Sequence, residues 1–434
     1  MLNNLYRNYI EPIRSFDRPA RLFLIMIVVD GLIYSGWQLF FNFYMLQSGY
    51  RLEFLGLVNS MPSAAGLLFG IPAGRISDRI GRKPSLMLGL GFSSLFMLAQ
   101  ITFRHPVIIA ASAFLAGIFN TLFLISQAPL MVKLSTTGNR TLLFSLNYGL
   151  QTMSGAVGAL FAGQLPGLFG ILLMVQEHSA TAYQAVLITS ILLGTTALIP
   201  LWLMKEPQGR PAPGKTPTSI AGRSPVTNGL RSSLAVMTAK MTAPQIMIGL
   251  GAAILIPYMN VFFKSRFNIS DSLLGVLFSI SDVLIGVGSL VAPQLSLRLG
   301  GKIHAVIVTQ LSSLVFLLLC GFSPFLWLSA GGFLVRTGLM NMASPLYSAF
   351  CMEGTPEHNQ GFVNSILNLS WNIGWSVGPF ISGVVQQRYG FTPLFISTAI
   401  LYLLAIGLAW FFFRNTESRD AGQQIMEPAR QPIE

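Results

Sequence analysis

The most constraining feature of this sequence is a series of long apolar runs. Twelve runs of about 20 or more mostly apolar residues follow one another along the 434-residue chain, and about 20 such residues cross the roughly 30 Å hydrocarbon core of a bilayer as one helix. Strands of a membrane barrel would instead be runs of about ten alternating residues. The sequence therefore predicts an all-α membrane protein with twelve transmembrane helices. The expected spans are 21–46, 53–74, 84–103, 106–132, 141–165, 182–204, 244–263, 272–297, 303–323, 325–351, 361–385 and 391–413.

Composition excludes other classes of protein. Hydrophobic residues make up 52% of the chain and charged residues only 10%, against about 25% charged residues in soluble domains. Disorder requires the opposite balance. The net charge of +12 does not indicate nucleic-acid binding, because the basic residues lie between the apolar runs and not in one patch. Cys320 and Cys351 are expected too far apart for a disulfide.

Lys and Arg also predict the orientation in the membrane. With a cytoplasmic N-terminus, 21 of the 27 basic residues fall in cytoplasmic segments and five in outer loops, while Arg336 lies within a span. Basic residues concentrate in cytoplasmic loops. We therefore expect both termini on the cytoplasmic side of the membrane. The expected membrane is a bacterial-type inner or plasma membrane, which the chain crosses several times.

A basic segment rich in Pro, Gly, Ser and Thr predicts the domain organisation. It interrupts the apolar pattern between the sixth and seventh spans and is typical of a flexible cytoplasmic linker. The expected parts are a six-helix bundle (1–204), the linker (205–243), a second six-helix bundle (244–416) and a cytoplasmic tail (417–434).

The two halves have features of a repeat. Residues 77–83 align with 296–302 at an offset of 219, and Phe114-Leu115 align with Phe333-Leu334 at the same offset. At an offset one residue larger, Gly158 and Gly163 align with Gly378 and Gly383. A parallel repeat predicts two pseudo-symmetric bundles about an axis along the membrane normal, with a binding site near the midplane.

A charged motif lies between the second and third spans. Residues 74–83 read Gly-Arg-Ile-Ser-Asp-Arg-Ile-Gly-Arg-Lys, so Asp78 is placed for charge-assisted hydrogen bonds with its basic neighbours. The motif resembles the G-x-x-x-D-R-x-G-R-[RK] loop of the major facilitator superfamily at every defined position, and the resemblance in organisation covers almost the whole chain. It implies the major facilitator fold and a secondary transporter that works by alternating access.

The resemblance also implies a gate. In the family this loop latches the two halves on the cytoplasmic side; the alternative is that its arginines only fix topology. We expect Glu353, at the inner end of the tenth span, to be a partner of the loop arginines, whereas the second-half copy of the loop has lost its acid at Leu297. The expected gating residues are Gly74, Asp78, Arg79, Gly81, Arg82, Lys83 and Glu353.

Small residues and prolines predict close helix packing in two spans. Glycines on one helix face let a second helix approach, and a proline permits a bend. The expected packing residues are Gly66 and Gly70, with Gly374, Gly378 and Pro379 of the eleventh span. Drug–proton antiporters of the superfamily have a similar G-x-x-x-G-P element in span 5, where this chain lacks the proline, and Gly117 stands where the family often has an arginine.

Three ionisable residues fall inside spans. Asp30, Asp282 and Arg336 each lie about ten residues from a span end, which is ~15 Å at the helical rise of about 1.5 Å per residue. Such a residue costs about 2.5–3.5 kcal/mol to insert and is a functional candidate by default. Tyr34, Gln38 and Phe41 share the Asp30 face of the first span, with Trp37 beside it.

The resemblance implies that spans 1, 4, 7 and 10 line one cavity, which Asp30 and Arg336 would face from opposite halves. Asp30 would then carry the coupling proton or bind a cationic group; the alternative is a structural ion pair with Arg336. Arg336 could instead bind an anionic substrate, and Asp282 could be functional or only hydrogen-bond to span 5. The further cavity residues expected are Asn120, Gln127, Tyr258, Asn260, Met340, Asn341, Ser344 and Tyr347.

No P-loop, H-E-x-x-H motif or zinc-ligand spacing is present in the sequence, so we expect no enzyme, ATP-driven pump, cofactor or metal. The expected partners are a small-molecule substrate, protons and the lipid bilayer, without nucleic acid, and the expected state is a monomer. The favoured function is a proton-coupled antiporter for efflux of amphipathic or aromatic compounds. Uptake of a sugar or organic anion, and a lipid flippase or non-transporting sensor, remain alternatives.

Overall fold

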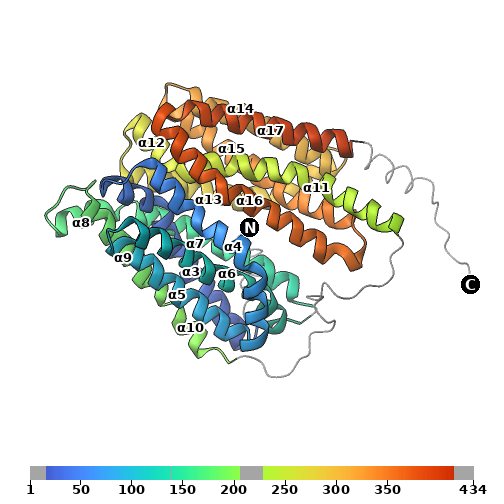
Figure 1. Ribbon diagram of the computed structural model, residues 1–434, viewed down its shortest axis with the longest axis horizontal. Coiled ribbons are helices and arrows are strands. Elements are labelled where there is room, and N and C mark those ends of the chain that lie inside the picture. Colours follow the sequence, from blue (N-terminus) through green and yellow to red (C-terminus); the bar gives the residue numbers. More distant parts are fainter. Residues whose placement is uncertain (1–15, 137, 206–227, 415–434) are drawn as a thin grey trace, which may run out of the picture. The chain divides into compact units, whose positions relative to one another are not determined.

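The computed structural model describes residues 16–136, 138–205 and 228–414, and it is almost entirely helical there (Figure 1). The first basic residues of the N-terminal tail, most of the expected linker and the C-terminal tail 417–434 lie outside the described residues. The helices are α3 (Arg18–Gln47), α4 (Leu52–Ile80), α5 (Arg82–Thr102), α6 (Pro106–Leu134), α7 (Arg140–Ala162), α8 (Leu165–Leu172), α9 (Ala180–Thr195), α10 (Leu198–Leu203), α11 (Asn228–Leu255), the 3-10 turn η2 (Ile256–Tyr258), α12 (Met259–Phe267), α13 (Asp271–Arg298), α14 (Lys302–Phe322), α15 (Leu326–Glu353), α16 (Glu357–Tyr389) and α17 (Thr392–Phe413).

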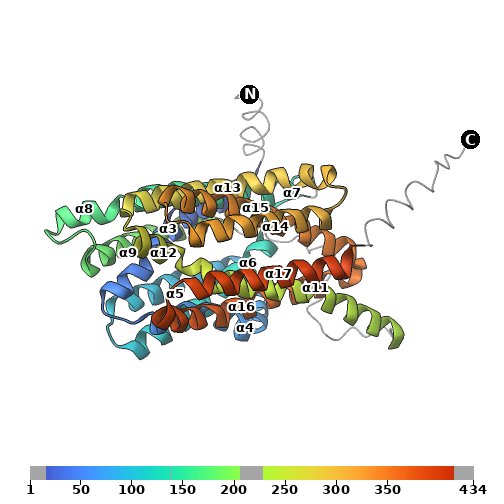
Figure 2. The same ribbon diagram turned by 90° about the horizontal axis from the view of Figure 1, so that it is seen from above.

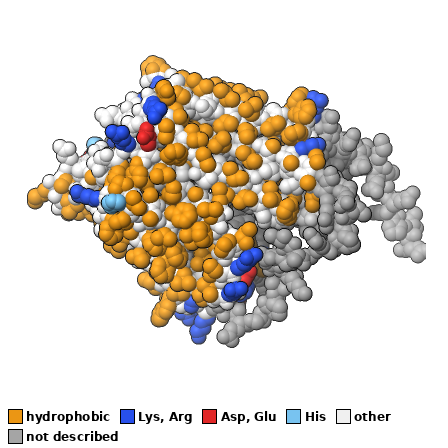
Figure 3. Space-filling model, in the orientation of Figure 1, with side chains coloured by type: hydrophobic (Ala, Val, Ile, Leu, Met, Phe, Trp, Pro, Cys, Tyr) orange, Lys and Arg blue, Asp and Glu red, His pale blue; other side chains and the backbone are white. Residues whose placement is uncertain are grey.

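Ten helical segments of the described chain are long and apolar enough to cross a membrane. The two remaining expected spans correspond to α15 and α16, which are 28 and 33 residues long; α15 contains Arg336 and α16 is rich in amides. Side chains on the face drawn in Figure 3 are mostly hydrophobic, and the few charged ones visible lie towards its margins. This surface is suited to lipid, as the fold class requires.

The helices form two compact units. One unit contains Met1–Thr216, Ile256–Val283 and Trp375–Gly390, and the other contains Pro217–Leu255, Leu284–Gly374 and Phe391–Glu434. The first unit therefore includes segments of the second half of the sequence. The boundaries 1–204 and 244–416 of two six-helix bundles stay a prediction.

In the first unit, α3 packs on α7 and α9, and α6 packs on α4 and α5. Glycines allow the closest of these approaches: a Cβ on Gly158 of α7 would lie 2.1 Å from the Leu32 carbonyl oxygen of α3. Gly117 of α6 similarly faces Pro62 of α4, where a Cβ would lie 2.5 Å from the Pro62 Cα. An arginine at this position of α6 would not fit, which explains why the family's residue is absent.

In the second unit, α14 packs on α15 and α17, and α11 packs on α17; α11 and α17 run side by side in both ribbon views (Figures 1 and 2). α11 begins at Asn228, so the expected linker 205–243 is helical in its last part. Leu234, Met237 and Met241 explain this difference, because they pack on the core of the unit together with Ile303 and Phe350.

The charged motif 74–83, expected as a loop, is helical except at Gly81. α4 ends at Ile80 and α5 begins at Arg82, and Gly81 has φ 96°, a left-handed value that favours glycine. The second half turns in the same way at Gly300 (φ 75°) and Gly301 (φ 145°). Gly300 is the residue that the offset of 219 places on Gly81, so the turn geometry agrees with the repeat.

The expected packing glycines of α4 differ in their surroundings. A Cβ on Gly66 would lie 3.3 Å from the Thr121 Oγ1, but none of the described atoms lies within 4 Å of such a Cβ on Gly70. Close packing is therefore not seen at Gly70, whereas α6 approaches α4 near Pro62 and Gly66. Gly374 does pack closely, since its Cβ would lie 2.5 Å from the Leu250 nitrogen of α11.

Candidate functional site

A cavity of about 310 Å³ lies within the first unit. Side chains of α3, α4, α5, α6 and α9 line it, together with residues of η2, α12 and α13 and the aromatic Trp375 of α16. The expected site residues among its lining are Asp30, Tyr34, Trp37, Gln38, Phe41, Asn120 and Asn260. Several polar residues outside that expectation also line it, namely Asn42, Asn59, Ser63, Ser93, Ser94, Gln100 and Ser190.

The α3 side of the cavity follows from helical periodicity. Asp30, Tyr34, Gln38 and Phe41 are three or four residues apart and so share one helix face. Trp37 and Phe41 stack, with their ring centroids 4.3 Å apart and their planes inclined by 16°. Asp30 is half-buried, whereas the Tyr34 side chain is 60% exposed. The face therefore offers a carboxyl group next to a flat apolar surface.

Asp30 is the only charged residue among the described residues that line this cavity. It has no ion-pair partner within the described part of the chain. A carboxyl group without a fixed counter-ion can bind a proton or a cation. The cavity can therefore accommodate a proton or a cationic group, whereas an anion would meet no positive side chain in its lining.

An asparagine network joins α3, α4 and α12 at the cavity. Asn42 Nδ2 donates to the Pro257 carbonyl oxygen (2.7 Å) and to Asn260 Oδ1 (3.0 Å), and Asn59 Nδ2 donates to Asn42 Oδ1 (3.1 Å). Asn260 Nδ2 donates to the Leu39 carbonyl oxygen (2.8 Å). The break in the helix at η2 exposes the Pro257 carbonyl for this contact. Sequence reasoning missed Asn42 and Asn59, because neither lies on the Asp30 face.

Two further expected residues lie in the first unit but not in the cavity lining. Tyr258 is fully buried and donates to the Pro379 carbonyl oxygen (2.9 Å). Gln127 is 7% exposed, and its Nε2 has no hydrogen-bond partner among the described residues. Neither side chain is in the lining of this cavity, and their expected role in a binding site stays a prediction.

Arg336 does not contribute to the cavity that contains Asp30. It lies in the second unit, is 5% exposed, and donates from Nη2 to the Tyr402 hydroxyl (2.6 Å), with its guanidinium carbon 5.6 Å from the centre of the Tyr402 ring. Its side chain turns towards α17, whose phenol serves as its polar partner. The expectation that Arg336 and Asp30 face one cavity from opposite halves stays a prediction.

Three other expected residues of α15 also have partners within the second unit. Met340 Sδ accepts a contact from Ser313 Oγ (3.6 Å), and Asn341 Nδ2 donates to the Thr337 carbonyl oxygen (2.9 Å). Tyr347 donates to the Met241 carbonyl oxygen (2.6 Å). None of the three is in the lining of the cavity of the first unit, and their expected place in a cavity shared by both halves stays a prediction.

A second cavity of about 240 Å³ lies within the second unit and is uncharged. One of its amides bonds within its own helix: Asn368 Nδ2 donates to the Asn364 carbonyl oxygen (3.0 Å). Its lining consists of Gln245, Ser344, Tyr347, Ser348, Asn364, Leu367, Asn368 and Trp371.

Asp282 is half-buried and lies close to α7. A Cβ on Gly155 would lie 3.4 Å from its Oδ2 and 3.7 Å from Ser35 Oγ. Phe278, one turn earlier in α13, lines the cavity, but Asp282 itself does not. The carboxyl group therefore stands beside the contact of α13 with α7, as expected of a group facing span 5.

The gating motif forms a local ionic network. Arg82 pairs with Asp78 and donates from Nη1 to Ser77 Oγ (2.8 Å), which is 2.7 Å from Ser126 Oγ of α6. Lys83 Nζ donates to the carbonyl oxygens of Trp202 (2.9 Å) and Met204 (2.6 Å) at the end of α10. The motif thus ties α4 and α5 to α6 and α10.

Glu353 has a lysine partner within its own unit. Its carboxylate pairs with Lys302 at the start of α14, within the second unit. Lys302 belongs to the second-half copy of the 74–83 motif, and the expected pairing of Glu353 with the arginines of that motif stays a prediction.

The comparisons with known proteins agree with this geometry. The family model of the Major Facilitator Superfamily matches residues 22–241 and 241–434. The chain belongs to the major facilitator superfamily, and it is a membrane transporter of that fold.

Among curated proteins, the chain is 24% identical to a class H tetracycline resistance protein of Pasteurella multocida over 412 residues, which cover 91% of this chain and 96% of the relative. It is 25% identical to the multidrug resistance protein MdtG of Enterobacter lignolyticus over 192 residues, which is 43% of this chain and 44% of that protein.

Among solved structures, the fold resembles a bacterial homologue of the human lysosomal transporter Spinster (TM-score 0.74, 14% identity, covering 96% of this chain and 99% of that one). It also resembles the nucleoside transporter NupG (TM-score 0.68, 14% identity, 91% and 98%) and a D-xylose–proton symporter (TM-score 0.67, 13% identity, 90% and 97%). These likenesses establish the fold.

We predict that the Asp30 cavity is open to water. Asn120 is exposed and lines it, whereas Ala113 of the same helix is 1% exposed. In a background without the two buried cysteines, N120C should therefore react with a small thiol reagent at least tenfold faster than A113C. Reactivity is measured by mass spectrometry on purified protein. Equal, slow reaction at both positions would show that the cavity is dry.

Proposed function

We propose that this transporter is a proton-coupled exporter of amphipathic or aromatic compounds, and that Asp30 carries the coupling proton. The observation on which this depends is the single carboxyl group of the first cavity, which has no cation in its lining. A charged group at this depth is costly unless water, a proton or a substrate compensates it. Proton binding and release by Asp30 would satisfy that requirement in each half of a transport cycle.

The lining supports the substrate class. The stacked pair Trp37–Phe41 presents a flat apolar surface, and Tyr34 and Phe278 extend it. Apolar pockets with a few placed polar groups are typical of small-molecule sites. Similarity to tetracycline resistance and multidrug resistance proteins supports export of such compounds. A cationic or neutral aromatic compound fits this lining better than an anion.

The sequence supports the placement in the membrane. The excess of Lys and Arg in alternate connections favours cytoplasmic termini and an inner or plasma membrane. Tyr50, in the first expected outer loop, donates to the Arg104 carbonyl oxygen of the second (2.6 Å), so two segments expected on one side do meet.

A second candidate function is uptake of a neutral, hydrogen-bonding solute such as a sugar. The observation that favours it is the cavity of the second unit, whose lining has three amide side chains, three hydroxyls and no charge. Arg336 supports uptake of an organic anion less well, since its guanidinium is buried against Tyr402.

A thermal-shift screen separates these candidates. Purified protein is mixed with tetracycline, cationic aromatic dyes, sugars, nucleosides and organic anions, and its Tm is measured. A ligand at about 100 times its Kd stabilises the folded state by ~2.7 kcal/mol. We expect aromatic compounds to raise the Tm and anions to leave it unchanged. A rise with sugars or organic anions alone would overturn the proposed substrate class.

Proton coupling by Asp30 predicts a selective defect. In D30N, flux driven by a proton gradient should fall to background, because the amide cannot exchange a proton, while counterflow exchange of the compound found by the screen should persist. Both are measured in proteoliposomes. D282N, the same change at the membrane carboxyl outside the lining, should keep gradient-driven flux. Equal loss of both activities in D30N would assign Asp30 to binding or structure instead.

A gating role of Asp78 predicts slower transport at unchanged affinity. D78N removes the partner of Arg82 but leaves the cavity intact, so the maximal rate should fall several-fold while the KM stays within about twofold. R75Q, which removes a charge from the same motif without breaking this pair, serves as the matched control. An unchanged maximal rate in D78N would leave the motif with a topological role only.

A further inference from the structure

Two glycine contacts join the halves of the sequence within the first unit. A Cβ on Gly163 of the α7–α8 connection would lie 2.9 Å from the Gly275 Cα of α13, and one on Gly383 of α16 would lie 3.1 Å from the Gly56 Cα of α4. The repeat relates these contacts, because Gly56 and Gly275 are 219 residues apart and Gly163 and Gly383 are 220 apart. All four lie at span ends expected on the outer side. The halves thus touch at two equivalent points.

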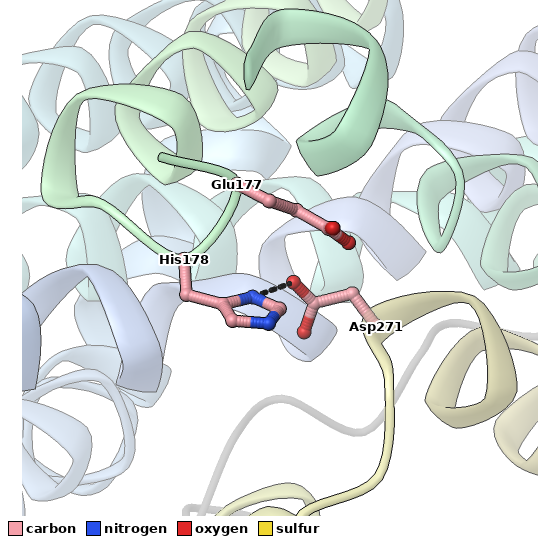
Figure 4. A group of neighbouring side chains, drawn as sticks. All are labelled: Glu177, His178 and Asp271. Carbon is pink, nitrogen blue, oxygen red and sulfur yellow. Dashed lines mark hydrogen bonds and ion pairs between the residues drawn. The ribbon is translucent and has the colours of Figure 1, made fainter. Parts of the chain in front are cut away.

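A buried ionic cluster stands beside only one of these contacts. Asp271, the first residue of α13, is fully buried, and its carboxylate pairs with Lys264 of α12. Its Oδ2 lies 3.0 Å from His178 Nδ1 and accepts a hydrogen bond from the Tyr183 hydroxyl (3.0 Å). Figure 4 shows His178 and Asp271 pointing toward one another from two different segments, with Glu177 beside them. The cluster therefore joins the α8–α9 connection and α9 to the α12–α13 corner.

Lys264 is the centre of this cluster. Its Nζ donates to the Tyr183 hydroxyl (2.7 Å), lies 3.2 Å from His178 Nδ1, and stands 5.0 Å from the centre of the Phe43 ring. Its side chain is only 15% exposed. Aromatic faces and hydroxyls compensate a cation that has lost most of its water.

A metal ion is a poorer explanation of the same atoms. Glu177, His178 and Asp271 each offer a ligand atom within 4.8 Å of one another. However, the Lys264 ammonium already contacts both Asp271 and His178, and a metal there would face that positive charge at close range. The ammonium, not a metal, balances the Asp271 carboxylate.

The Lys264–Asp271 pair and the side chains that contact it belong to different halves of the sequence. Lys264 and Asp271 are seven residues apart and can stay paired when the halves separate, whereas Tyr183, His178 and Phe43 come from the first half. Opening therefore need not leave an unpaired charge, which would be costly. What opening does break is the set of contacts from Tyr183, His178 and Phe43 to the ion pair.

We propose that the Lys264–Asp271 pair is an outer latch that holds the transporter closed on the outer side by docking on Tyr183 and His178. The proposal rests on alternating access within the proposed function, but not on the identity of the substrate or on proton coupling. Tyr183 and His178 are thus gating residues rather than substrate contacts.

The test measures access to the cavity from outside. The reporter is N120C in the cysteine-free background, labelled in intact cells with a membrane-impermeant thiol reagent. Y183F removes one hydroxyl from the latch and retains the ring that stacks on Phe40, so folding is preserved. Hydrogen bonds to charged groups are strong, and we expect labelling to rise about tenfold, which corresponds to ~1.4 kcal/mol. K264Q should raise it at least as much.

Y44F is the matched control, because Tyr44 donates to the Ile101 carbonyl oxygen (2.6 Å) within the first half; it should label like the parent. Unchanged labelling in Y183F, or an equal rise in Y44F, would overturn the latch. An increase only when the reagent is on the opposite side, in inverted vesicles, would overturn its assignment to the outer side. Since neither flux nor a proton gradient is measured, failure of proton coupling leaves this result intact.

Discussion

A bilayer cannot solvate charge, and several ionisable groups of the described residues are placed according to that constraint. Asp30 has no ion-pair partner among the described residues, but it lines a cavity. Arg336 is buried and relies on the Tyr402 hydroxyl and ring. Lys264 and Asp271 compensate each other. In the proposed mechanism a carboxyl group without a fixed counter-charge can exchange its proton, and this distinguishes Asp30 from the charges that are neutralised in place.

Beside the proposed latch, the halves of the sequence also meet at contacts that need no charge. At Gly163–Gly275 and Gly56–Gly383 the backbones meet without side chains between them, so many weak dispersion contacts form over a short distance. Such contacts are lost completely when the helices part, because no flexible side chain can follow. The asparagine network around Asn42 adds directional hydrogen bonds, which fix the register of α3 against η2 and α12.

Local patterns in the sequence were sufficient to predict most of the fold and one face of the site. Span positions follow from runs of apolar residues, and Asp30, Trp37 and Phe41 could be placed together because helical periodicity relates residues three to eleven positions apart. The partner of Arg336 could not be predicted, since Tyr402 lies 66 residues away along the chain. The same is true of Asp271 and His178, separated by 93 residues. α11 also begins within the expected linker, because apolar side chains stabilise a helix there. Composition alone indicated a coil for that segment.

The positions at which the two halves carry different residues are informative about the two sides of the membrane. The offset of 219 places Leu297 on Asp78 and Leu52 on Asp271, so each half has an acid where the other half has a leucine. Asp78 pairs with Arg82 at the Gly81 turn, on the side expected to be cytoplasmic, and Asp271 pairs with Lys264 on the opposite side. In the proposed cycle Asp78 acts in the cytoplasmic gate and Asp271 in the outer latch, so each side depends on an acid from a different half. The strength of each gate would then be independently adjustable, as an alternating-access cycle between two states of similar free energy requires.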